Sequence, residues 1–129
     1  NPTNARIFHE RGVCFALLKE PEKALRDFQT AYQLDPENES TCEKLGNMQY
    51  LLKRYKEAII SYSRALAISP ENNELYQARG DCRFKLDDLI GAAADYSRAL
   101  ELNPRAGQTF YRRGVVKVQM GERESGCQD

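Results

Sequence analysis

Four glycines recur at a constant spacing of 34 residues along the chain: Gly12, Gly46, Gly80 and Gly114. Alanines and prolines recur in the same phase: Ala24, Ala58 and Ala92, then Pro36, Pro70 and Pro104. A fixed period of this size is typical of repeat architectures, in which each unit buries its apolar face against its neighbours. Because a single 34-residue unit is too small to bury a core alone, this period constrains the fold more than the total length of 129 residues does.

Each unit contains two segments with apolar residues at helical spacing, separated by a short polar turn. In the first unit the two stripes include Phe8, Phe15 and Leu18, then Leu25 and Phe28. No segment alternates apolar and polar residues, and no hairpin dipeptide separates apolar runs, so strands are not expected. Each unit ends at a proline, which cannot continue a helix.

The period predicts the domain organisation directly. Residues 1–4 form the tail of a preceding repeat, because Pro2 is in phase with the later prolines. Three complete repeats follow at residues 5–38, 39–72 and 73–106. Residues 107–129 form a partial fourth repeat, with its first helix and the start of a second helix at Glu122.

This order of residues resembles the tetratricopeptide repeat (TPR), a 34-residue helix-turn-helix unit with the pattern W-x2-L-G-x2-Y…A-x3-F…P. The third unit carries much of the pattern: Tyr76, Gly80, Ala92, Tyr96, Ala99 and Pro104. One departure is the usual tyrosine three positions after the glycine, which is replaced by Gln49, Arg83 and Lys117 in three units. The resemblance implies an all-α fold, a right-handed superhelical α-solenoid of antiparallel helix-turn-helix repeats.

The resemblance also implies a non-enzymatic scaffold for protein–protein interaction, which binds a peptide or helix of a partner in a concave groove lined by the first helices. The candidate partner-binding residues are Val13, Asn47, Tyr50, Asp81, Phe84, Lys85, Tyr111 and Val115. Exposed aromatic and aliphatic side chains suit a partner with apolar side chains. Tyr50 and Phe84 have a second interpretation, in which they pack against a neighbouring unit in place of the missing tyrosine.

Two other functions are weighed against this one. One family mode grips the C-terminal carboxylate of a chaperone tail, but only Asn47 and Arg112 match its clamp residues, so this partner is not expected. The alternative function is a structural spacer or self-association segment of a longer TPR array with no ligand of its own. This alternative is supported by the two ends of the sequence, neither of which shows the polar capping face that terminal repeats carry.

A comparison of the units with one another predicts a structural ion pair. Three units place an arginine before the glycine and an aspartate sixteen residues later: Arg11 with Asp27, Arg79 with Asp95, and Arg113 with Asp129. The second unit has Leu45 and Ser61 instead. Paired change of this kind indicates contact between the two helices of a unit, although chance or shared ancestry of the units would give the same pattern.

Composition excludes several classes of function. The 19 basic and 19 acidic residues balance, so there is no basic stripe for nucleic acid. No cofactor, metal or catalytic site is expected, because His9 is the single histidine and no nucleophile–base pair is evident. Cys14 and Cys82 share a register with Met48 and Val116, so both are expected in the core. Unpaired cysteines, with no membrane span or signal pattern, predict a cytoplasmic protein.

Overall fold

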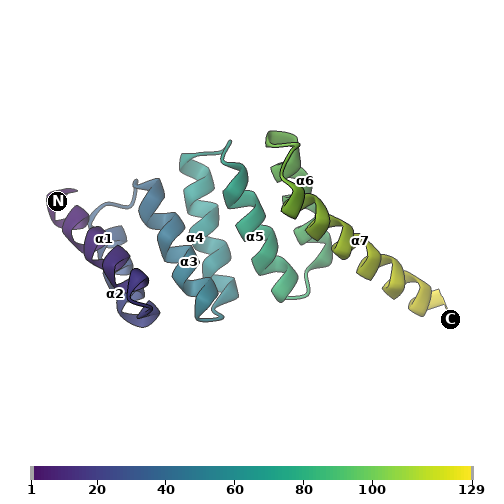
Figure 1. The fold of residues 1–129 in the computed structure, drawn as a ribbon, viewed down its shortest axis with the longest axis horizontal. Helices are drawn as coiled ribbons and strands as arrows, with labels where there is room; N and C mark the ends of the chain where they lie inside the picture. The colour runs from purple at the N-terminus through teal and green to yellow at the C-terminus, as the bar shows by residue number, and fades with distance from the viewer. Residues whose placement is uncertain (1, 129) are drawn as a thin grey trace. The chain divides into compact units, whose positions relative to one another are not determined.

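In the computed structural model, which describes the backbone of residues 2–128 and the side chains of residues 3–125, the elements of regular structure are all helices. Figure 1 shows them in chain order: α1 (Pro2–Leu17), α2 (Pro21–Leu34), α3 (Glu39–Leu51), α4 (Tyr55–Ile68), α5 (Asn73–Lys85), α6 (Leu89–Leu102) and α7 (Gly107–Gln128). The all-α fold expected from the sequence is confirmed.

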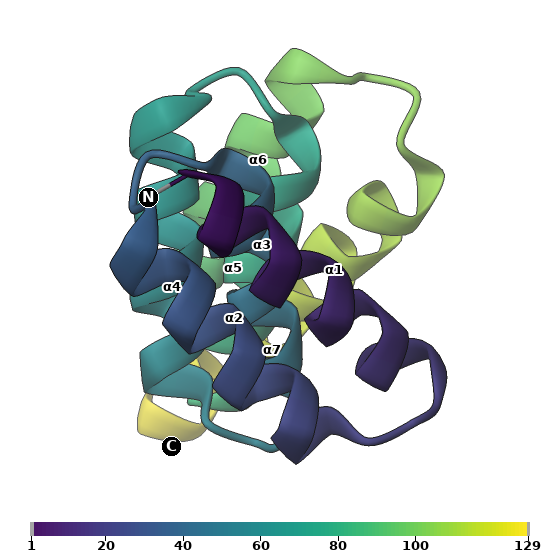
Figure 2. The same ribbon diagram turned by 90° about the vertical axis from the view of Figure 1, so that its left-hand side faces the viewer.

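The chain divides into two compact units. The N-terminal unit, Asn1–Pro70, contains the helix pairs α1–α2 and α3–α4, and the C-terminal unit, Glu71–Asp129, contains the pair α5–α6 followed by α7. Figure 2 views the N-terminal unit from its end, with α1 and α2 in front of α3 and α4. Each unit has its own apolar cluster, centred on Phe28 in the first and on Tyr96 in the second.

The turn inside each helix pair depends on one residue with a left-handed backbone. Lys19, Lys53 and Asp87 have φ values of 61°, 63° and 68°, and they lie 34 residues apart. The amide after each one closes the turn; for example, the Asp88 N–H donates to the Arg83 carbonyl at 2.8 Å. This bond satisfies a carbonyl that the helix end leaves unpaired. The turn therefore reverses the chain after each first helix.

Three of the four periodic glycines allow an aromatic ring to lie directly on a helix backbone. A Cβ added at Gly80 would stand 2.8 Å from the Tyr96 ring, and the same separation holds for Gly12 under Phe28 and Gly46 under Tyr62. Real Cβ atoms essentially never approach so closely. Gly80 therefore lies where the two helices of its pair come closest to each other through the Tyr96 ring. The ring and the glycine together set how closely the two helices of a pair approach.

Cys14 corrects part of the sequence prediction, because its side chain is exposed rather than in the core. Cys82 occupies the same register and is buried, and burial raises the pKa of its thiol to about 12. Two other side chains at this position of the repeat pack toward the preceding helix. Met48 belongs to the apolar cluster with Phe28 of α2, and Val116 belongs to the cluster with Tyr96 of α6. Among the described residues no helix pair precedes α1, so this face of α1 meets solvent.

The first and last residues also differ from the sequence prediction. Residues 2–4 begin α1 instead of closing a preceding repeat, and proline is tolerated there because a first helical residue needs no intrahelical N–H bond. At the other end, α7 continues through Glu122 to Gln128, and the expected turn and second helix do not form. Gly121 is the counterpart of the left-handed Asp87, yet no glycine has a positive φ among the described residues.

The C-terminal part of α7 contacts the preceding helix pair. Met120 packs against the apolar cluster that contains Tyr96, and Arg123 donates to Asp87 in the α5–α6 turn. Nothing stands within 4 Å of a Cβ added at Gly114, in contrast to Gly12, Gly46 and Gly80.

Gly80 and Gly114 offer a matched pair of substitutions within one unit. We expect Gly80→Ala to lower the free energy of unfolding by about 1–3 kcal/mol, because the new methyl group overpacks against Tyr96. Gly114→Ala should raise it by up to ~1 kcal/mol, because alanine is the better helix former and the space is open. Urea unfolding followed by circular dichroism measures both, and equal effects of the two changes would contradict this packing.

Candidate functional site

In the C-terminal unit, polar side chains tie α7 to α5 along the predicted groove positions. Asp81 accepts a hydrogen bond at 2.8 Å from the guanidinium of Arg112, and a second at 2.5 Å from the hydroxyl of Tyr96. One turn earlier on each helix, the Thr109 hydroxyl donates to the Gln77 side-chain oxygen at 2.7 Å. Asp81 was expected to meet a partner, and the structure places it in a network inside the protein.

The environment of Asp81 shifts its ionisation. Burial raises the pKa of the Asp81 carboxyl, while the hydrogen bond from Tyr96 and the charge of Arg112 act in the opposite direction. Burial is the larger effect because it removes water from the carboxylate, whereas Arg112 is partly exposed and screened. The charged form of Asp81 is therefore less favourable in the folded chain than in the unfolded chain.

Beside this network, α7 presents an exposed apolar surface that we call the α7 hollow. Its volume is about 640 Å³, and it is lined by Gly107, Phe110, Tyr111, Gly114, Val115, Val118, Gln119 and Glu122. Tyr111 is 73% exposed, and Phe110 and Val118 are each 62% exposed. Large apolar side chains left this open, next to a depression of ligand size, are typical of an interaction surface.

The remaining candidate residues of the C-terminal unit divide between the interior and the surface. Phe84 is half-buried and packs against the cluster of Leu89, Ala92, Tyr96 and Val116, as the packing interpretation requires. Lys85 is exposed at the end of α5, and Val115 is half-buried at the edge of the α7 hollow. Tyr111 is thus the one predicted aromatic candidate in this unit with its ring largely in solvent.

In the N-terminal unit, the candidate residues make internal contacts. Tyr50 stacks edge-on against Tyr55 at a centroid distance of 5.4 Å, and Val13 packs against the Phe28 cluster. The hydroxyl of Tyr62 donates to the Asn47 side-chain oxygen at 2.5 Å. His9 lies 3.0 Å from the Thr41 hydroxyl, and burial, reinforced by Lys44, lowers the pKa of its imidazole.

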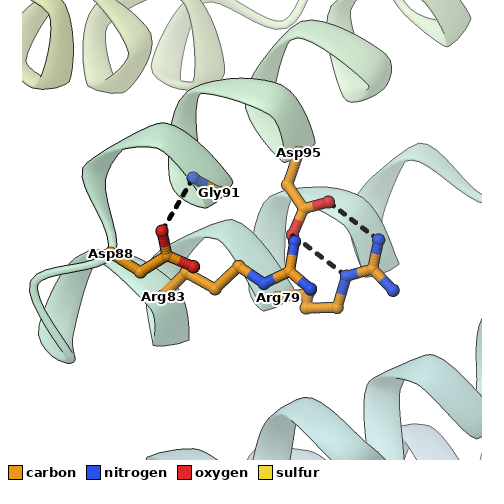
Figure 3. Close-up of polar contacts among 5 residues, drawn as sticks. All are labelled: Arg79, Arg83, Asp88, Gly91 and Asp95. Carbon is orange, nitrogen blue, oxygen red and sulfur yellow. Dashed lines mark hydrogen bonds and ion pairs between the residues drawn. The ribbon is translucent and has the colours of Figure 1, made fainter.

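The structure places two of the predicted arginine–aspartate pairs in direct contact. Arg79 donates two hydrogen bonds to the carboxylate of Asp95, at 2.8 and 3.0 Å, and Arg83 lies 3.3 Å from the same carboxylate (Figure 3). Arg11 donates to Asp27 in the same two-pronged way, with both distances 2.8 Å. Asp95 is 4% exposed, so its charge depends on these arginines for compensation.

The other two predicted repeats differ at these positions. Asp129 lies outside the described residues, and Arg113 donates to the Ser97 hydroxyl at 3.4 Å. In the α3–α4 pair, the Ser61 hydroxyl donates at 2.6 Å to the side-chain oxygen of Gln49. Neutral hydrogen bonding therefore replaces the ion pair where Leu45 replaces arginine.

Figure 3 also shows why a glycine is present in the first turn of α6. The Asp88 carboxylate caps the helix by accepting from the Gly91 N–H at 2.9 Å. A Cβ at residue 91 would collide with that carboxylate and approach the Arg83 side chain at 2.9 Å. Glycine lowers the helix propensity at this position. Its lack of a side chain leaves room for the Asp88 cap and for Arg83, which offsets that cost.

The candidate residues Asn47 and Asp81 have three hydrogen-bond partners that were not among the predicted site residues: Arg112, Tyr62 and Tyr96. The sequence does contain a signal for the two tyrosines. The ring position is Phe28 where Val13 stands fifteen residues earlier, but it is tyrosine where Asn47 or Asp81 stands there. A hydroxyl appears only opposite a side-chain acceptor. The comparison of units that pointed to the ion pairs would also have found this pair.

Two further properties restrict the chemistry of the site. Across the part of the chain that the structure describes, no group of three or more His, Cys, Asp or Glu side chains could hold a metal ion. None of the described helices is long and apolar enough to cross a membrane.

Comparison with known proteins agrees with this architecture. Models described as "Tetratricopeptide repeat" match residues 5–38 and 74–105, and a model described as "TPR repeat" matches residues 46–87. The chain therefore belongs to the tetratricopeptide repeat family, and its fold is a TPR solenoid. A comparison with curated protein sequences finds no match.

Several solved structures are similar. The first TPR domain of Spaghetti (RPAP3), bound to the HSP90 peptide SRMEEVD, is 22% identical with a TM-score of 0.89, over 94% of this chain and 96% of that one. The Yersinia enterocolitica type III secretion chaperone SycD, in complex with a peptide of the translocator YopD, is 17% identical with a TM-score of 0.84, over 89% and 93%. The MamA protein is 25% identical with a TM-score of 0.88, over 94% of this chain and 66% of that one.

The Arg79–Asp95 pair can be tested by a double-mutant cycle with Arg79→Leu and Asp95→Ser, which install the residues found at Leu45 and Ser61. We expect a coupling energy of about 1–2 kcal/mol in the free energy of unfolding, because either single change leaves a charge without its main partner near the core. The exposed pair Arg6 and Glu10 serves as the control, with coupling below about 0.5 kcal/mol. Zero coupling between Arg79 and Asp95 would contradict a structural role.

The buried Asp81 predicts a pH dependence whose sign follows from its raised pKa. Because the folded pKa lies above the unfolded value of 3.8, the native protein should lose stability, relative to Asp81→Asn, as pH rises through 3.8 and on through the raised folded pKa. Urea unfolding at several pH values measures the difference. Asn47→Asp should show a larger loss, because the counterpart of Arg112 is Ala78. A native protein that gains stability over this range would show that Arg112 outweighs burial.

Proposed function

We propose that this chain is a non-enzymatic interaction module that binds a peptide or helix of a protein partner, with the α7 hollow as the main contact surface. The observation that carries the proposal is the exposure of Tyr111, Phe110 and Val118 around a depression of about 640 Å³. Aromatic side chains combine large contact area with few rotatable bonds, so they serve well as binding anchors. Two of the similar structures contain bound peptides, which supports this kind of partner.

The chemistry of the surface restricts the partner. The polar candidates Asp81 and Asn47 already accept hydrogen bonds from Tyr96 and Tyr62, so they offer little to a ligand. Affinity must then come mainly from apolar contacts on α7, with Glu122 supplying charge in the lining of the α7 hollow. A partner segment with apolar side chains at helical spacing suits this surface.

A chaperone C-terminal tail fits this surface poorly. Of the residues that match the clamp pattern, Asn47 accepts from Tyr62, and Arg112 forms an ion pair with Asp81. Using Arg112 to bind a carboxylate would leave the partly buried Asp81 without its cation, which costs free energy. The likeness to the HSP90 peptide complex therefore supports peptide binding in general rather than this ligand.

Peptides selected from a phage-displayed random library against the native protein provide the probe for this proposal. We expect Tyr111→Ala to weaken the selected peptides by about 10- to 100-fold, since truncating a buried aromatic anchor costs about 1.5–3 kcal/mol. Lys53→Ala, an exposed change in the other unit, is the matched control and should leave affinity unchanged. The peptide SRMEEVD should show no measurable binding. Unchanged affinity in Tyr111→Ala, or tight SRMEEVD binding, would overturn the proposal.

A second candidate function is self-association through the same helix. Nothing stands within 4 Å of a Cβ added at Gly114, whereas Gly12, Gly46 and Gly80 each lie under an aromatic ring. A side chain of another copy could therefore pack on α7 at Gly114. Sedimentation of the free protein at increasing concentration separates the two functions. A strict monomer excludes self-association, and a dimer lost in both Tyr111→Ala and Phe110→Ala would favour it.

A further inference from the structure

A second hollow lies in the N-terminal unit, on the side where α2 and α4 flank α3. Its volume is about 460 Å³, which is within the usual range for ligand sites. α2 contributes Gln29, Tyr32 and Gln33, α3 contributes Leu45 and Gln49, and α4 contributes Glu57, Ile60, Ser61 and Arg64. Gln49 and the groove residue Asn47 are two positions apart, so they point to nearly opposite sides of α3. We call this depression the outer hollow.

The outer hollow occurs where the repeat lacks its ion pair. At the equivalent positions of the α5–α6 pair, Arg79, Arg83 and Asp95 form a connected charged cluster. In the α3–α4 pair the three positions hold Leu45, Gln49 and Ser61, which together are smaller and uncharged. All three of these residues form part of the wall of the depression. The exception in the repeat pattern thus coincides with an accessible space.

The outer hollow contains hydrogen-bond donors with no acceptor inside the described part of the protein. Gln49 uses its side-chain oxygen to accept from Ser61, while its amide nitrogen has no acceptor among residues 3–125. Gln49 is 6% exposed and lines the hollow, and no fully buried side-chain nitrogen or oxygen among residues 3–125 lacks a partner, so this nitrogen keeps a small contact with solvent. The Arg64 guanidinium stacks over the Tyr32 ring at 4.9 Å and makes no hydrogen bond or ion pair with a described residue.

The charges in the outer hollow are separated along α4. Arg64 and Glu57 are seven residues apart, which is two helical turns or about 10.5 Å of rise. An extended peptide covers about 10 Å in three residues. Between the two charges, Ile60 is 52% exposed and offers an apolar wall opposite Tyr32. Gln29 and Gln33 at the rim add amide groups that can pair with a peptide main chain.

We propose that the outer hollow binds an extended segment of a protein partner that carries an acidic residue and, three residues away, a basic residue. The acidic side chain pairs with Arg64, a main-chain carbonyl accepts from the Gln49 amide, and the basic side chain pairs with Glu57. A small apolar side chain between them lies against Ile60 and Tyr32. This site is separate from the α7 hollow, and it stands or falls independently of the function proposed above.

Nuclear magnetic resonance with a synthetic probe tests the site. The probe is the acetylated and amidated peptide Gly-Ser-Glu-Ser-Val-Lys-Ser-Gly, in which acid and base are three residues apart. We expect saturable shifts of the Gln49 side-chain amide and Arg64 Nε signals at millimolar peptide. The control peptide Gly-Ser-Val-Ser-Glu-Lys-Ser-Gly has the same composition with adjacent charges, and it should bind at least fivefold more weakly.

Variants assign the contacts. Arg64→Gln and Glu57→Gln should each weaken the probe at least fivefold, while Arg26→Gln, an exposed arginine of α2 outside the hollow, should leave binding unchanged. The triple variant Leu45→Arg, Gln49→Arg and Ser61→Asp installs the charged cluster of the α5–α6 pair and should abolish binding. Circular dichroism checks its fold, and Arg64→Gln tests the site even if the triple variant unfolds.

Three outcomes would overturn the proposal. The first is the absence of saturable shifts with the spaced probe, and the second is an equal response to the adjacent-charge peptide. The third is an equal response to sodium glutarate, which would show that the hollow binds a free carboxylate rather than a peptide segment.

Discussion

The contact of an aromatic ring with a glycine backbone is the interaction on which the rest of this structure depends. It brings the two helices of each pair together at Gly12, Gly46 and Gly80. The free energy gained by burying the ring offsets the cost of the left-handed residue in the turn. At Gly114 nothing stands within 4 Å of an added Cβ, and α7 continues through Gly121, the counterpart of the left-handed Asp87. The three helix pairs thus share two features: an aromatic ring on the glycine and a left-handed turn residue.

The same contact explains the polar residues along the predicted groove. A ring buried against glycine can carry a hydroxyl only if an acceptor is near, since an unpaired buried hydroxyl is costly. Tyr62 donates to Asn47 and Tyr96 donates to Asp81. Phe28 has no hydroxyl and needs no acceptor, and the equivalent position of its repeat is the apolar Val13. Asp81 then requires a cation, which Arg112 on α7 supplies. Asp81 was expected to bind a partner, but its contacts with Tyr96 and Arg112 show that it stabilises the packing of the protein itself.

Much of the fold could be predicted from the sequence because the period states which residues must share an environment. The three helix pairs and the first helix of the fourth repeat follow from spacing alone, whereas the second helix expected at Glu122 does not form. The exposure of Cys14 and the continuous α7 could not be predicted in this way, because they depend on what neighbours a helix rather than on its own residues. For the site, Phe84 and Tyr111 are both aromatic candidates for the groove, yet one packs on a core cluster and the other is largely in solvent. This difference follows from the tertiary packing around each ring and is not visible in the sequence.

The α3–α4 pair, which has Leu45, Gln49 and Ser61 in place of the charged cluster, shows how one repeat of an array can differ from the others in its surface chemistry. Where Arg79, Arg83 and Asp95 meet, the three charged side chains pair with one another. Replacing that cluster by Leu45, Gln49 and Ser61 keeps a single internal hydrogen bond, and it frees the Gln49 amide nitrogen to face the outer hollow beside Arg64. The helix pair still closes, because the ring of Tyr62 on Gly46 does not depend on these three positions. Closure and surface chemistry are thus set by different residues of the same two helices, so one repeat can change its surface without losing its fold.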